Sequence, residues 1–224
     1  MTGKQINRFY PDYWQKRYML LMAACLLFTA MVSNTAQARG LFGSIESNQR
    51  GLEIFPQWLS VLERHVLEDT PEGNCNSNRF NRCHLKQWLS YLETLKGQDT
   101  RTQLKNINLY ANKKEYILDI DNYNLDDYWA IPKQFLQRGG DCEDYAITKF
   151  LSLRWLGLQQ LATRIVVLQD ANLGIPHAVL AVYLDGDTLI LDNQVNEVIS
   201  HRNIRHYIPI YSIDEKQWWV HLPS

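Results

Sequence analysis

The hydrophobic pattern of this 224-residue chain changes its period once, near residue 163. Before that point, apolar residues recur every three or four positions, which predicts amphipathic helices over 52–68, 84–95 and 101–118. After it, short β-branched or aromatic runs predict strands. These runs are TRIVVLQ, HAVLAVYL, DTLILDN, HYIPIYS and QWWVHL. Helices that precede strands indicate an α+β fold with an antiparallel sheet.

Two of the predicted strands are joined by Asp185-Gly186, a dipeptide typical of two-residue hairpin turns. A turn at this point places the flanking strands side by side. We therefore expect a helical part over 52–118 and a second part over 119–224, whose first residues are acidic and irregular.

The first 38 residues have the three parts of a secretory signal peptide. Residues 1–17 are mostly basic in charge, an uncharged apolar run ends at Val32, and Ala36 and Ala38 form a small-residue cleavage motif. The apolar run is shorter than the roughly 20 residues that a membrane-spanning helix needs. We expect cleavage and a mature domain over 39–224 in an oxidising compartment, with an uncleaved amphipathic anchor as the alternative.

Cys75 and Cys83 lie in one polar stretch, PEGNCNSNRFNRCH. In an oxidising compartment the two are candidates for a disulfide, with two free thiols as the alternative. A zinc site that includes His84 is less favoured, because the spacing matches no zinc pattern. Cys142 is left over from any such pairing.

Cys142 lies between the predicted helices and the predicted strands. It follows Gly139-Gly140-Asp141 and precedes an apolar helical pattern. Asp141 suits the N-cap of a helix, so Cys142 is predicted in the first turn. A helix N-terminus lowers a thiol pKa, and its free N–H groups can hold an oxyanion. A structural cysteine in a core helix is the alternative, but the flanking acids are untypical of one. The pattern therefore favours a nucleophile.

A nucleophilic cysteine needs a base, and His177 opens a predicted strand 35 residues later. Asp192 ends the next strand, and the hairpin turn between them sets position 177 opposite about 193–194. Asp192 is then within cross-strand reach of the imidazole and can orient it.

The motifs GGDCEDYA, PHAVLAV and LILDNQ together resemble the bacterial transglutaminase-like cysteine proteinases, and most of all their LapG-type periplasmic members. The resemblance implies a papain/transglutaminase-like core whose nucleophile-bearing helix packs on an antiparallel sheet. It assigns Cys142 as nucleophile, His177 as base and Asp192 as orienting carboxylate. The Cys–His–Asp order is shared with acyl and amide transferases, so a transferase is the alternative, and a non-catalytic binding module is a third reading.

The family resemblance also implies partners and a location. Such proteases act in the periplasm and cleave large biofilm adhesins near their N-terminal end, which releases the adhesin from the cell surface. The periplasmic domain of an inner-membrane cyclic di-GMP receptor sequesters them. Nucleic acid is not an expected partner, because the formal net charge is only -1.

Three carboxylates, Asp141, Glu143 and Asp144, surround the cysteine in sequence. Their charge disfavours a thiolate, and a bound cation would cancel that penalty. Carboxylate oxygens suit Ca²⁺. Capping of the helix and complementarity to its dipole are the alternative explanation.

The resemblance implies calcium dependence through Asp141 and Glu143. Asp126 and Asp127, in the acidic stretch upstream, and Asp144 are further candidate ligands. This stretch is not an EF-hand, because DIDNYNLDDYWA lacks the required Gly and Glu positions. Trp129 in the same stretch is a candidate oxyanion donor through its indole N–H, and a packing role is equally compatible with its position.

Overall fold

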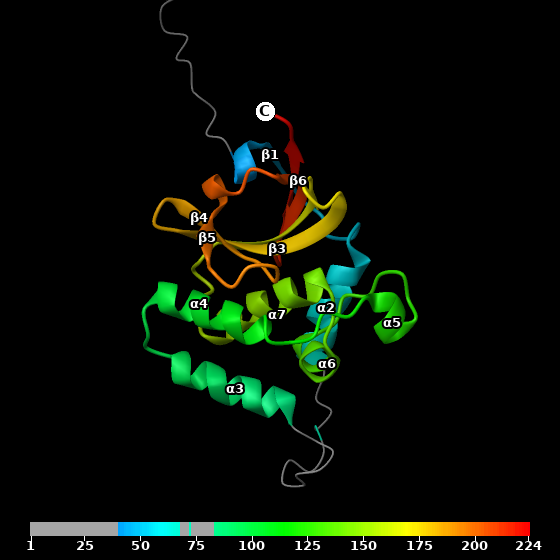
Figure 1. Ribbon diagram of the computed structural model, residues 1–224, viewed down its shortest axis with the longest axis vertical. Coiled ribbons are helices and arrows are strands. Elements are labelled where there is room, and N and C mark those ends of the chain that lie inside the picture. The colour runs from blue at the N-terminus through cyan, green and yellow to red at the C-terminus, as the bar shows by residue number, and fades with distance from the viewer. Residues whose placement is uncertain (1–39, 68–71, 73–82) are drawn as a thin grey trace, which may run out of the picture. The chain divides into compact units, whose positions relative to one another are not determined.

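The computed structural model describes residues 40–67, 72 and 83–224 (Figure 1). The predicted signal peptide over 1–38 lies outside them. The helical elements are η1 Leu41–Gly43, α2 Pro56–Leu67, α3 His84–Leu95, α4 Thr100–Ala111, α5 Asp119–Tyr123, α6 Pro132–Arg138, α7 Cys142–Trp155 and η2 His201–Asn203. The strands are β1 Ile45–Gln49, β2 Thr163–Asp170, β3 Ile175–Leu184, β4 Asp187–Leu191, β5 Ile199–Ser200, β6 Tyr207–Ile213 and β7 Trp218–Leu222.

The strands form one antiparallel sheet in the order β1-β7-β6-β2-β3-β4-β5. The α+β prediction is confirmed, and each of the five predicted strands is present within two residues of its expected bounds. The strands β1 and β5 were not predicted, because β1 reads IESNQ without an apolar alternation and β5 has two residues. Both lie at the edges of the sheet, where a strand needs little apolar surface.

The turn at Asp185-Gly186 sets the register of β3 and β4. Both residues have positive φ, 53° and 75°, and Leu184 pairs with Asp187 across them. This is the two-residue hairpin that the dipeptide predicts. The pairing continues to Leu180 opposite Leu191, so Asp192 follows directly after the last paired residue of β4.

The helix α7 is the central helix of the fold and packs against β2, β3, α4 and α6 (Figure 1). Eleven of its 14 residues are buried, so it has apolar contacts on all sides rather than one apolar stripe. Ile147 and Phe150 face the larger of two apolar cores. A second core contains Leu41 and Tyr207 together with alternate residues of the central strands.

The third predicted helix is shorter than expected, since α4 ends at Ala111 rather than 118. The chain after it pairs instead with the segment before α7. The N–H of Ile117 donates to Gly140 O at 3.0 Å, and the N–H of Gly140 donates to Glu115 O at 3.3 Å. These long-range bonds hold residues 115–117 extended. Residues 119–133 are likewise more regular than expected, because they contain α5 and the first residues of α6.

The described helices include none with the length and apolar character that crossing a membrane requires.

Candidate active site

Cys142 is the first residue of α7 and a free thiol, as the sequence predicts. Asp141 holds the N-cap position, but its side chain makes no capping hydrogen bond, contrary to expectation. The backbone N–H of Ala178, on β3, donates to the Cys142 sulfur. This contact fixes the start of the helix against the strand that carries His177.

A pocket of about 250 Å³ opens between this helix start and the sheet. It is lined by Asp127, Trp129, Cys142, Glu143, Val167, Pro176, His177, Ala178 and Tyr211. Tyr211 enters it from β6 next to an irregularity in the β2–β6 register at Val167 and Leu168. Such bulges redirect side chains beside active sites. Nothing in the sequence motifs pointed to Tyr211.

His177 lines this pocket, and its imidazole contacts Asp192. Nε2 of His177 is 3.0 Å from Oδ1 of Asp192, and both side chains are almost fully buried. Burial opposes ionisation of Asp192, but hydrogen bonds, first from His177 and then from Tyr207 and the Gln194 N–H, hold its pKa below the ordinary value. An ionised Asp192 accepts a hydrogen bond from the Nε2–H of His177, which leaves Nδ1 of His177 as the basic nitrogen.

Tyr207 is a further residue of this network that sequence reasoning missed. Its hydroxyl donates to Oδ2 of Asp192 at 2.6 Å, so both carboxylate oxygens are engaged. No motif marks Tyr207, because it reaches Asp192 only through the strand order β6-β2-β3-β4.

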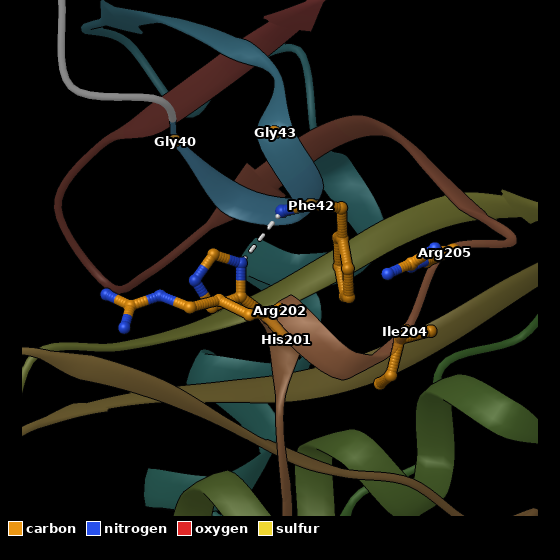
Figure 2. Close-up of a pocket in the computed structure, with 7 residues that line it drawn as sticks. All are labelled: Gly40, Phe42, Gly43, His201, Arg202, Ile204 and Arg205. Carbon is orange, nitrogen blue, oxygen red and sulfur yellow. Dashed lines mark hydrogen bonds between the residues drawn. The ribbon is translucent and has the colours of Figure 1, made fainter.

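Phe42, which contacts the ring of Tyr207, lines a pocket of about 460 Å³ together with Gly43 of η1 and His201 of η2 (Figure 2). Phe42 lies edge-on to Tyr207, with ring centroids 5.6 Å apart, and to His201 at 6.0 Å. Its N–H donates to Nδ1 of His201 at 3.0 Å, the dashed line in Figure 2. The first described residues of the chain therefore support the tyrosine that holds Asp192.

A cluster of carboxylates lies beside the cysteine. One oxygen each of Asp119, Asp141 and Asp144 lie within 4.8 Å of one another. Within the described residues, Oδ1 of Asp119, Oδ1 of Asp141 and Oδ2 of Asp144 are buried and lack a hydrogen-bond partner. Their second oxygens are partly satisfied, since the N–H of Tyr128 donates to Asp119 at 2.5 Å and that of Ala130 donates to Asp144 at 2.6 Å.

Glu143 joins two further groups of this kind, one with Asp119 and Asp127 and one with Asp141 and Cys142. The candidate ligands predicted from the sequence are thus brought together except for Asp126, which is exposed and belongs to none of the three groups. Asp119 was missed as a ligand candidate. Its signal was weak, because it lies 22 residues before Asp141 in a stretch that fits no metal motif.

Burial and mutual repulsion disfavour the charged forms of these groups. Burial raises the pKa of Glu143 to about 10 and that of Asp119 to about 6, and raises the pKa of Asp144 well above its ordinary value. Burial, followed by the charges of Glu143 and Asp141, also raises the pKa of the Cys142 thiol. Burial and the neighbouring carboxylates therefore both oppose the thiolate in the ion-free protein.

The cluster fits a hard divalent cation. It offers several carboxylate oxygens, three of them buried and unpartnered in the described chain, which is the donor chemistry that Ca²⁺ prefers. Capping of α7 does not explain the cluster, because the Asp141 side chain caps nothing.

Trp129 lies in the wall of the cysteine pocket, as the oxyanion prediction requires, and its side chain is 7% exposed. Its indole N–H, however, donates to the Asp127 carboxylate. Cys83 is in a disulfide. Cys75, its predicted partner, lies outside the described residues.

These features define a cysteine protease of the transglutaminase-like class. The chain belongs to the bacterial transglutaminase-like cysteine proteinase family, whose model matches residues 73–224. Among solved structures, Legionella pneumophila LapG is 28% identical with a TM-score of 0.58, and the match covers 71% of this chain and 87% of that one. Calcium-bound and EGTA-treated forms of LapG match with the same score and identity. Among curated protein sequences, no relative matches the chain.

The raised pKa values predict how the ion-free protein responds to pH. The folded state binds the Asp119 proton with a pKa of about 6, against 3.8 for the ordinary group, so it holds more protons than the unfolded chain between these values. Stability without calcium should therefore fall as pH rises through this window, and Glu143 acts in the same direction. Melting temperatures in EGTA should be lower at pH 7 than at pH 5. Saturating calcium should raise the value at pH 7 more than that at pH 5; an equal calcium effect at both pH values would contradict this assignment.

Proposed function

We propose that this protein is a calcium-dependent cysteine endopeptidase in which Cys142, His177 and Asp192 form the catalytic triad. The observation that carries the proposal is one pocket that holds both Cys142 and His177, with His177 bonded to buried Asp192. All three residues lie within residues 73–224, the range that the family model matches.

The chemistry follows from the groups in the pocket. The proton of Cys142 passes to Nδ1 of His177, and the sulfur attacks the scissile carbonyl carbon. The backbone N–H groups at the start of α7 stabilise the oxyanion, with Trp129 as a candidate further donor. The imidazolium then protonates the leaving amine, and a thioester remains on Cys142. His177 next takes a proton from water, which hydrolyses the thioester and restores the thiol.

Calcium, held by Asp119, Asp141, Glu143 and Asp144 with Asp127 nearby, would neutralise the charge beside the thiol. Asp141 is central to this role, because it belongs to two of the three carboxylate groups and directly precedes the nucleophile. The calcium-bound and EGTA-treated forms of Legionella LapG support a calcium site in this protein.

The substrate that we propose is the N-terminal region of a large surface adhesin, whose cleavage releases the adhesin and controls biofilm attachment. We propose the periplasmic domain of an inner-membrane cyclic di-GMP receptor as the regulatory partner. The support for both is the family and the similarity to LapG. A pull-down of the catalytically inactive protein with that receptor domain tests the partner, and absence of binding at micromolar concentrations would exclude it.

Substitution at the triad should separate nucleophile from orienting group. We expect Cys142→Ala to lower cleavage of the adhesin fragment at least about 10³-fold, and Asp192→Asn to lower it less. Both rates are measured on purified protein with unchanged circular dichroism. Residual activity of a few per cent in Cys142→Ala would refute the nucleophile. Failure of a thiol-directed acylating probe to label wild-type Cys142 would favour a binding module, and transfer of the acyl group to added amines rather than water would identify a transferase.

Removal of calcium should stop cleavage, because the carboxylates then keep the thiol protonated. We expect EGTA to abolish activity, Ca²⁺ to restore it and Mg²⁺ to restore it poorly, since Mg²⁺ needs a tighter octahedral shell. Asp119→Asn and Asp141→Asn should lose calcium binding in titration calorimetry. The matched control is Asp121→Asn, an exposed residue of α5 outside the three carboxylate groups, which should bind normally. Full activity in excess EGTA would disprove the metal role and leave the triad standing.

The location in the periplasm rests on the predicted signal peptide. Cell fractionation should recover a species that begins near Arg39 from the periplasm. Mass spectrometry that finds the intact Met1 start on membrane-bound protein would favour the uncleaved anchor instead.

A further inference from the structure

Side chains of α2 hold the chain segment that forms one wall of the cysteine pocket. Nη2 of Arg64 donates to the Trp129 carbonyl at 2.5 Å, and Nη1 donates to the Tyr128 hydroxyl and to Oε1 of Gln134, each at 2.8 Å. Nε donates to Ser60 at 3.0 Å. The guanidinium also lies over the Tyr128 ring, 5.0 Å from its centroid. Each guanidinium nitrogen of Arg64 therefore donates a hydrogen bond, and three of the four bonds reach residues outside α2.

Gln57, the second residue of the same helix, binds the segment at a second point. Its Oε1 accepts from the N–H of Trp129 at 3.2 Å, and its Nε2 donates to the Asp127 carbonyl at 3.2 Å and to the Asp127 carboxylate. The helix itself is anchored by Trp58, which is fully buried and donates to the Asp214 carbonyl at 2.8 Å. The clamp is therefore built on a fixed element.

The clamped segment, residues 127–130, serves both halves of the site. Asp127 and Trp129 line the pocket that contains Cys142. The backbone N–H groups between and after them bind the carboxylate cluster, Tyr128 to Asp119 and Ala130 to Asp144. A displacement of this segment would move the pocket wall and two carboxylates of the cluster together.

The family match begins at residue 73, whereas α2 ends at Leu67. We propose that Arg64 is a positioning residue of the active site, and that α2 completes the catalytic domain from outside the region that defines the family. Arg64 acts through the 127–130 segment and touches neither substrate nor ion. The planar fork of the guanidinium suits this role, because it serves a carbonyl, a hydroxyl and an amide oxygen at once, whereas an ammonium is a single point donor.

The inference rests on the proposed function, and its test uses the mature protein with four readouts. These are calcium affinity by titration calorimetry, kcat and KM on an adhesin fragment, the rate at which iodoacetamide alkylates Cys142, and the melting temperature. We expect Arg64→Ala to weaken calcium binding and lower kcat/KM, each about tenfold or more, with alkylation measured in saturating calcium unchanged within about twofold. Arg64→Lys should recover only part of the loss.

Glu63→Gln, on the exposed side of the same helix, is the matched control and should equal wild type in all four readouts. Wild-type calcium affinity and kcat/KM in Arg64→Ala would overturn the inference. So would a parallel fall of alkylation, calcium affinity and melting temperature, because that is the signature of a scaffold residue. If wild type itself binds no calcium, the proposed calcium dependence fails, and kcat/KM relative to alkylation still decides the role of Arg64.

Discussion

Repulsion among buried carboxylates at the start of α7 is the constraint on which the rest of the site depends. One oxygen each of Asp119, Asp141 and Asp144 lie within 4.8 Å of one another, Glu143 lies beside them, and all but the half-buried Asp141 are buried, which weakens screening by water. Burial raises the pKa values of Glu143, Asp144 and Asp119, and burial followed by the charges of Glu143 and Asp141 raises the pKa of the Cys142 thiol. Under the proposed function, a bound cation would relieve this repulsion, and the activity of Cys142 would then depend on the ion.

The sheet positions His177 and Asp192 close enough to form a hydrogen bond. The tight turn at Asp185-Gly186 fixes β3 against β4, and pairing ends at Leu180 and Leu191. Beyond that point His177 remains paired with Leu168 of β2, and its side chain is hydrogen-bonded to Asp192. Tyr207 closes the arrangement from β6. The β3–β4 hairpin thus positions His177 and Asp192, and the N-terminus of α7 positions Cys142.

The parts of this site that sequence predicts are those encoded by local chemistry. Cys142 is marked by the two preceding glycines and the following helical pattern, and His177 and Asp192 are marked by a hairpin whose turn residues are unmistakable. The α+β class followed for the same reason, because a change of hydrophobic period is a local signal.

Residues that join the site only through long-range packing were not predicted. Asp119 meets Asp141 because residues 115–117 pair with Gly140, Tyr207 meets Asp192 across three strand neighbours, and Arg64 reaches Trp129 from a helix 65 residues away. The end of α4 was misplaced for a related reason, since the bridge to Gly140 overrides the helical pattern. A single sequence gives no local signal for contacts between residues that lie far apart along the chain.

The pairing of β1 with β7 has a consequence for when the fold can form. Ile45 lies opposite Leu222, so a strand close to the start of the described chain completes its hydrogen bonds only with residues at the very end. Contacts of such high sequence separation form late and slowly. A chain that begins to fold before β7 is present therefore leaves β1 without the strand that pairs with it here.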